Sequence, residues 1–148
     1  MTDISFYHLT TRSLEHALPK LLELTIDSGE RALVVVGNKE RIKLLNEHLW
    51  SYEASSWLPH GAKDDGDPSD HPIYLSLENE NPNSATFLFL VDGASGSELD
   101  TFKRVFDLFD GRDEEAVAAA RVRWASLKSG GHVLSYWRQG EDGRWNKA

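Results

Sequence analysis

The sequence contains no cysteine, which excludes disulfide bonds, catalytic thiolates and metal sites with sulfur ligands. It also lacks any apolar run close to the roughly 20 residues that a membrane-spanning helix needs. The opening residues, MTDISFYHL, lack the basic region and the apolar stretch of a secretory signal. Together these absences predict a cytoplasmic protein.

Positive charge is scarce. The 16 Lys and Arg residues are outnumbered by 24 Asp and Glu residues, and the net charge is −8. This balance argues against broad, non-specific nucleic-acid binding, which needs many cations facing phosphates. A local basic patch is still compatible with it. With 148 residues, 40% of them hydrophobic, the chain is expected to form one domain over residues 1–148 with a sizeable core.

The motifs of nucleotide-binding enzymes are missing. The strand-like run ALVVV is followed by GNKER, which has a single glycine where a dinucleotide-binding loop needs three. The segment DGASGSELD (92–100) has two glycines but no Gly-Lys-Ser/Thr. No G-x-S-x-G sequence supplies a nucleophile elbow either. We therefore expect no catalytic site and no cofactor, and keep a small nucleotide-dependent α/β enzyme as the alternative function.

The segment 60–72, HGAKDDGDPSDHP, is rich in groups that bind cations. These groups are His60, Asp64, Asp65, Asp67, Asp70 and His71. Their spacing fits neither an EF-hand loop nor an HExxH helix, and the glycines and proline favour a floppy segment. We expect a solvated, mobile acidic loop here, with a metal site as the less favoured interpretation.

Strand and helix patterns alternate along the chain. Strands are predicted at residues 4–9, 31–37, 73–77, 86–92, 104–110 and 132–139. Helices are predicted at 13–30, 38–52 and 113–128, with a helical turn at 98–102 and a turn or short hairpin in EDGRW. This order predicts an α/β fold, a three-layer α/β/α sandwich around a mostly parallel open sheet, Rossmann-like without a nucleotide site.

One basic and aromatic segment, 118–139, contains no Asp or Glu. Within its helical part, Arg121, Trp124 and Lys128 lie within about 60° of one another around the helix axis. Ala120 and Leu127 lie to one side and are expected to face the core. Trp124 is therefore predicted at the border of the buried stripe, with both cations on its solvent side.

We name Arg121, Trp124 and Lys128 the predicted socket. An indole ring between two cations suits a ligand with an apolar tip and a carboxylate, such as the C-terminus of a peptide. The alternative is that Trp124 is ordinary core and the cations are a solvated helix end favoured by the helix dipole. Residue types alone leave both interpretations open. Arg138 and the Tyr136-Trp137 pair are interpreted as strand structure.

A second candidate surface lies in LWSYEASSWLPH, residues 49–60. Trp50 is expected to be half-exposed on its helix, and Trp57, Leu58 and Pro59 form an apolar connection. Such segments either anchor a partner protein or plug the edge of a core, and two tryptophans beside a proline favour the partner slightly.

The chain resembles the chi subunit family of bacterial DNA polymerase III over nearly its whole length. The resemblance is carried by FYHL, ALVVVGNKERIKLLNEHLW, SSWLPHG, PIYLSL with FLFLVDG, and ARVRWASLKSGGHVLSYW. The spacing of Leu49-Trp50 to WLPH is the most specific element, followed by the Arg-x-x-Trp helix before a glycine.

This resemblance implies an adaptor of the clamp loader that has no catalysis and no nucleotide site of its own. Such subunits link the clamp loader, through the psi subunit, to single-stranded DNA-binding protein, which ends in an acidic tail with a terminal Phe. By position, Arg121 and Trp124 fall on the tail-binding surface, and helical geometry adds Lys128. Trp50 and Trp57, with Leu58 and Pro59, fall in the region that meets psi or another clamp-loader component. No sequence-specific nucleic-acid binding and no membrane binding are implied.

Overall fold

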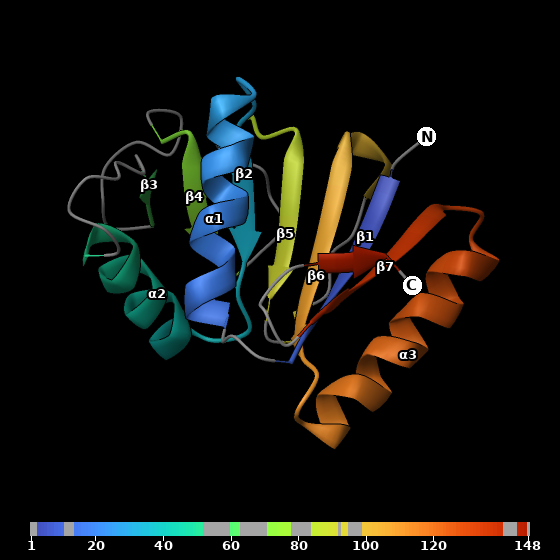
Figure 1. Ribbon diagram of the computed structural model, residues 1–148. Helices are drawn as coiled ribbons and strands as arrows, with labels where there is room; N and C mark the ends of the chain where they lie inside the picture. The colour runs from blue at the N-terminus through green and yellow to red at the C-terminus, as the bar shows by residue number, and fades with distance from the viewer. Residues whose placement is uncertain are drawn as a thin grey trace.

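A single sheet of eight strands organises the protein (Figure 1). The structure is a computed structural model, and it describes residues 3–10, 14–51, 60–62, 71–77, 84–91, 93–94, 99–140 and 145–147. The strands are β1 (Asp3–Leu9), β2 (Ala32–Val35), β3 (His60–Gly61), β4 (Ile73–Ser76), β5 (Phe87–Val91), β6 (Arg104–Asp110), β7 (Val133–Gln139) and β8 (Trp145–Lys147). Their order across the sheet is β3-β4-β2-β5-β6-β1-β7-β8.

Neighbouring strands are parallel from β3 to β7, and β8 pairs antiparallel with β7. The central strands are buried on both faces. Every residue of β2 is buried, and so is every residue of β1 except Asp3, as expected for parallel strands with both faces covered. The prediction of a mostly parallel sheet is confirmed, and the hairpin expected near EDGRW is the β7–β8 pair.

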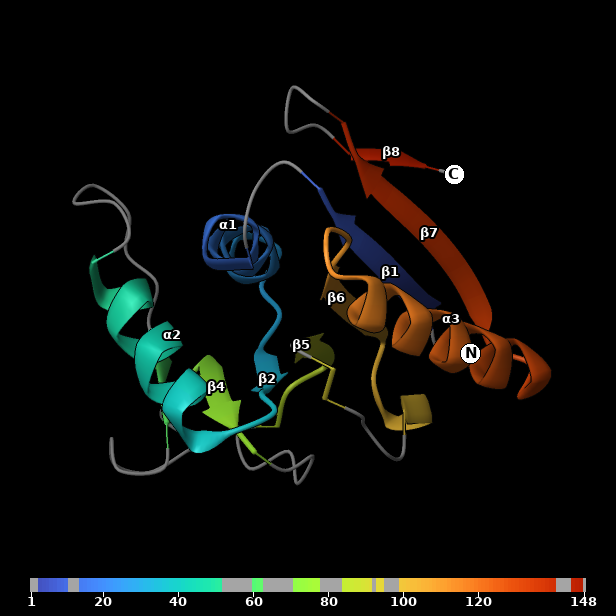
Figure 2. The same ribbon diagram turned by 90° about the horizontal axis from the view of Figure 1, so that it is seen from below.

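The helices cover the two faces of the sheet unequally (Figure 2). Helices α1 (Leu14–Asp27) and α2 (Lys39–Ser51) lie on one face, and α3 (Glu114–Ser129) lies on the other, along β6, β1 and β7. A short 3-10 helix, η2 (Leu99–Thr101), lies at the predicted helical turn. The predicted three-layer α/β/α architecture is confirmed. No helix of the described segments is long and apolar enough to cross a membrane.

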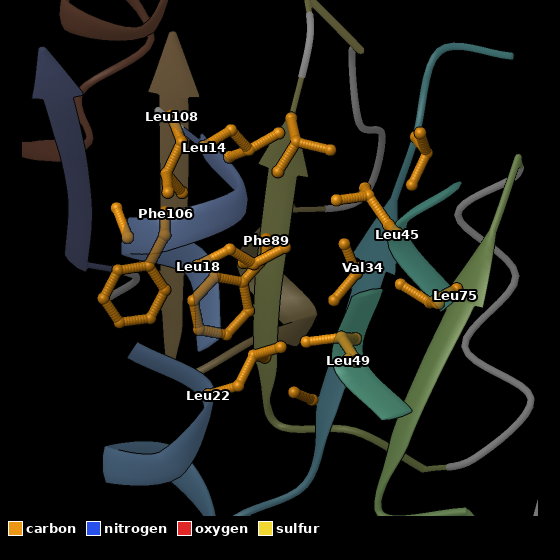
Figure 3. Packing of buried hydrophobic residues seen from close by; sticks show 14 of the residues in the cluster. Leu14, Leu18, Leu22, Val34, Leu45, Leu49, Leu75, Phe89, Phe106 and Leu108 are labelled. Carbon is orange, nitrogen blue, oxygen red and sulfur yellow. The ribbon is translucent and has the colours of Figure 1, made fainter. Parts of the chain in front are cut away.

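The core between α1, α2 and the sheet is built from long aliphatic side chains and stacked rings (Figure 3). Leu18 and Leu22 from α1 lie by Phe89 and Phe106, and Leu45 from α2 lies by Val34 of β2. All six are at most 4% exposed. The rings of Phe89 and Phe106 are stacked with centroids 4.4 Å apart. Burial of this apolar area is the main force that holds these two layers together.

Local sequence signals set the helix ends. The side chain of Asn38, the predicted N-cap of α2, accepts a hydrogen bond of 2.7 Å from the Arg41 backbone N–H. Asp113 caps α3 by accepting from the Glu115 N–H at 3.0 Å. At the other end, Gly131 has a φ of +84°, a value that favours glycine, and it follows the last turn as predicted.

The prediction of a mobile loop over 60–72 is wrong at its beginning. His60 and Gly61 form strand β3 and pair with Ile73 and Tyr74 of β4. The imidazole of His71 lies against Gly61, where an added Cβ would come within 2.6 Å of the ring. His71 also stacks on Tyr74, with ring centroids 6.3 Å apart. At residues 60 and 61, pairing with β4 therefore orders a segment whose polar, Gly-rich composition predicts a loop.

Candidate functional site: a cationic and aromatic surface of α3 and β7

Helix α3 attaches to the sheet by a narrow apolar stripe. Ala120 is buried at 3% exposure, and Val117, Trp124 and Leu127 pack partly buried against the cluster on this face of the sheet. Arg121 and Lys128 are exposed. The helical-wheel prediction for these residues is confirmed, because Ala120 and Leu127 face the sheet while both cations face solvent.

Trp124 belongs to the core and the surface at once. Its ring meets Phe6 of β1 edge-on at a centroid distance of 5.3 Å and Tyr136 of β7 at 5.8 Å. Such edge-to-face pairs add to the stabilisation from buried area. The side chain nevertheless keeps part of its surface exposed. A ring held rigidly at a surface in this way can offer apolar area to a ligand at little entropic cost.

Arg123, the third cation of α3 in the basic segment, is not available to a ligand. Its Nε donates to Asp107 Oδ2 at 2.7 Å and its Nη2 donates to Asp107 Oδ1 at 2.9 Å. Asp107 is 2% exposed in the middle of β6. Burial raises the pKa of Asp107, and the two bonds from Arg123 oppose that rise. This bidentate pair fixes α3 against the sheet.

A polar pair on β1 and β7 lies beside the predicted socket. The two strands are parallel, with Phe6 opposite Tyr136 and His8 opposite Arg138. Alternation along the strands therefore puts Phe6, His8, Tyr136 and Arg138 on the α3 face of the sheet. His8 Nδ1 and the Tyr136 hydroxyl are hydrogen-bonded to each other.

The charges of Arg121 on α3 and Arg138 on β7 both affect the pKa values of His8 and Tyr136. Burial lowers the pKa of His8, and the charges of Arg138 and Arg121 lower it further, while a backbone bond with Gly111 and the charge of Asp110 raise it. The pKa of Tyr136 is raised by burial and lowered by the same two guanidinium groups. The charges of Arg121 and Arg138 thus both act on one His–Tyr pair. The net effect is a pKa of His8 below its usual value of 6.5.

Sequence reasoning missed Arg138, Tyr136 and His8 as site residues. It correctly placed residues 136 to 138 in a strand, and period-two alternation would have put Tyr136 and Arg138 on one face. The pairing of β7 with β1, which brings His8 to them, carries no local signal. Trp137 lies on the opposite face, stacked on Tyr7 with ring centroids 6.4 Å apart and planes inclined at 11°.

The side chains of the other predicted site residues lie outside the part of the chain that the structure describes. Trp50 lies near the end of α2, but its side chain is outside the described residues, as are Trp57, Leu58 and Pro59. Asp64, Asp65, Asp67 and Asp70 of the acidic segment are outside them as well. Within the described ranges, no three His, Asp or Glu side chains are grouped so as to hold a metal ion.

Comparison with known proteins identifies the family. The family model described as DNA polymerase III chi subunit, HolC, matches residues 1–135. A probable DNA polymerase III subunit chi of Rickettsia prowazekii (strain Madrid E) is 26% identical over 157 residues, which cover 99% of this chain and 92% of that protein. The family match spans most of the sequence and includes all of α3. The chain therefore belongs to the DNA polymerase III chi subunit family.

Proposed function

We propose that this chi subunit acts in DNA replication as a non-catalytic adaptor that links the clamp loader to the acidic C-terminal tail of single-stranded DNA-binding protein. Membership of the family makes the chain a replication protein of the polymerase III complex. The proposal adds the tail as ligand and the α3 surface as its site. The observation that carries it is the half-buried Trp124, held edge-on by Phe6 and Tyr136 beside the exposed Arg121.

The chemistry of this surface fits such a tail. A terminal Phe offers a ring to Trp124 and a carboxylate to the planar guanidinium of Arg121, which can bind both carboxylate oxygens. Lys128, one turn on, adds a point charge for an acidic side chain. Because the chain carries a net charge of −8, a local cationic surface is needed to receive an acidic peptide. The negative remainder of the surface disfavours direct DNA binding.

Calorimetric titration with a synthetic acidic peptide that ends in Phe tests the proposal. Micromolar affinity that weakens as salt rises is expected. Arg121→Ala should lower the affinity at least tenfold, about 1.4 kcal/mol. Arg121→Lys should lower it less, since it keeps the charge but not the planar fork.

Two controls make the titration specific. The same peptide with an amidated C-terminus lacks the terminal carboxylate and should lose affinity for the wild-type protein but little for Arg121→Ala. Lys20→Ala removes an exposed cation on α1, on the opposite face of the sheet from α3, and should leave the affinity unchanged. Absence of binding by the wild type would contradict the function. An unchanged affinity in Arg121→Ala would contradict the site.

The partner on the clamp-loader side is proposed from sequence alone. Trp50, Trp57, Leu58 and Pro59 are assigned to the psi subunit or another clamp-loader component. Co-elution of the two purified proteins in size-exclusion chromatography measures this interaction, and Trp57→Ala should reduce it. Arg121→Ala is the matched control that should not affect co-elution, because the two surfaces are proposed to be separate.

The alternative function is that of a small nucleotide-dependent α/β enzyme. The cationic and aromatic surface of α3 does not support it. It is tested by thermal unfolding with ATP, NAD and GTP. A saturable rise of several degrees in the melting temperature with one of them would favour this alternative over the adaptor.

A further inference from the structure

A second exposed arginine lies on β7, the strand that packs against Trp124 of α3. Arg138 lies on β7, opposite His8 of β1, and it is exposed. Arg138 follows Tyr136 by two residues on the same face of β7, and Tyr136 packs edge-on against Trp124 of α3, the helix that carries Arg121. The charges of both arginines also lower the pKa of His8. Among the described residues, no acidic side chain forms an ion pair with either arginine.

His8 and Tyr136, beside Arg138 on this face of the sheet, are held in place and do not neutralise it. A Cβ at position 111 would lie 2.0 Å from His8 Nε2, so the imidazole fills the space that glycine leaves. The bond between His8 and the Gly111 backbone raises the pKa of the ring, as a bond to an accepting carbonyl does. On its other side the ring is held by the hydrogen bond between Nδ1 and the Tyr136 hydroxyl.

The carboxylate of Asp110, whose charge acts on His8, is already bound to Arg112. Asp110 accepts bonds from Arg112, from the backbone N–H at 2.9 Å and from Nε at 3.1 Å. Asp107, on the α3 face of β6, is bound to Arg123. The neighbouring acids thus leave Arg121 and Arg138 as a pair of like charges. Such a pair is stabilised when an anionic ligand lies between its members.

We propose that Arg138 is a second cation of the socket and binds an acidic side chain upstream of the ligand's terminal carboxylate, while Arg121 binds the carboxylate itself. Tyr136, fixed by His8, forms the wall between the two cations. The inference rests on the proposed function, since it assumes an acidic peptide on α3. It makes the socket a two-point site built by a helix and a strand. The match to the family model ends at residue 135, so Arg138 is a feature of this chain outside that match.

A double-mutant cycle between Arg138 and the peptide tests the proposal. Two Phe-terminated peptides are titrated by calorimetry, one with Asp residues before the Phe and one with Asn in their place. Arg138→Ala should weaken binding of the Asp peptide about fivefold, the range of a single exposed ion pair. It should leave binding of the Asn peptide unchanged. Arg138→Lys should recover most of the affinity for the Asp peptide.

The outcomes separate the inference from the function on which it rests. If the wild type binds and Arg121→Ala is weakened, but Arg138→Ala binds both peptides as the wild type does, the inference is wrong and the proposed function stands. If Arg138→Ala weakens both peptides equally, the residue acts without contacting the upstream acid, and the inference is wrong. If the wild type binds neither peptide, the proposed function and the inference fall together. Lys20→Ala serves as the charge-matched control, and thermal unfolding verifies that each variant is folded.

Discussion

Arg123 on α3 and Asp107 on β6 form a bidentate ion pair across the interface between helix and sheet, with bonds of 2.7 and 2.9 Å. The side chain of Asp107 is 3% exposed and that of Arg123 is 18% exposed. An ion pair this deeply buried positions the helix because neither charge can be left alone in the core. The angle at which α3 presents Arg121 and Trp124 therefore depends on a cation that is itself not free to bind a ligand.

Removal of Arg123 should strongly destabilise the protein. Arg123→Ala leaves the Asp107 carboxylate buried without its partner, and we expect a loss of about 3–5 kcal/mol in the free energy of unfolding. Urea denaturation measures this loss. Arg112→Ala breaks the exposed pair with Asp110 and is the matched control, with an expected cost below about 1 kcal/mol. Equal effects of the two variants would show that the buried pair has no special role.

Gly111 should not tolerate a side chain. A Cβ there would lie 2.0 Å from the His8 ring and 2.7 Å from the Leu9 carbonyl oxygen, so one of these groups must move. We expect Gly111→Ala to cost about 1–3 kcal/mol of stability, the usual range for overpacking. Gly130→Ala is the control, since its nearest contacts are at 3.4 Å and its φ is −77°, and its effect should be much smaller. A thermal melt of both variants gives the comparison.

His8 should make the protein less stable as the pH falls. Its pKa is lowered in the folded state from 6.5, by burial and then by Arg138, so the unfolded chain binds a proton more readily than the folded chain. The contribution of His8 is complete above pH 6.5 and is lost as the pH falls below that value. NMR titration of the His8 ring should give a pKa below 6.5. A value above 6.5 would show that Asp110 and the Gly111 backbone outweigh burial and the two arginines.

An anionic ligand should reverse part of this shift. A carboxylate bound near Arg121 and Arg138 offsets their charges, so the pKa of His8 should rise in the complex. By linkage, the affinity for the acidic peptide should rise as the pH is lowered from 7.5 to 5.5. Calorimetry at the two pH values measures the effect, and His8→Asn should abolish it. Affinity that is independent of pH would place the ligand's carboxylates away from His8.

Trp124 should matter for stability as well as for binding. Trp124→Ala removes the edge contacts with Phe6 and Tyr136, and we expect a loss of about 2–3 kcal/mol in stability together with most of the peptide affinity. Trp124→Tyr should retain much of both, because it keeps an aromatic ring at the contact. Val122→Ala, at an exposed position on the same helix, should change stability by less than about 0.5 kcal/mol. If Trp124→Ala binds the peptide normally, the ring serves only the core.

The sequence alone determined the class of fold and the local limits of most of its elements. The β-branched run at 31–37 predicted a buried strand, and Asn38 and the Gly130-Gly131 pair predicted the helix ends. These predictions hold because caps, glycine turns and apolar periodicity act within a few residues of the chain. The border position of Trp124 followed in the same way from the geometry of one helix.

Only the tertiary structure decided which residues surround that tryptophan. The parallel pairing of β1 with β7 places His8 beside Tyr136, although 128 positions separate them in the chain. The same packing joins Arg123 to Asp107 and so divides the basic segment into a structural cation and exposed ones. Strand order and ion pairing across layers depend on long-range packing that local patterns do not encode. The sequence therefore predicted a cationic, aromatic helix, and the sheet behind it supplied Arg138 and the His–Tyr pair.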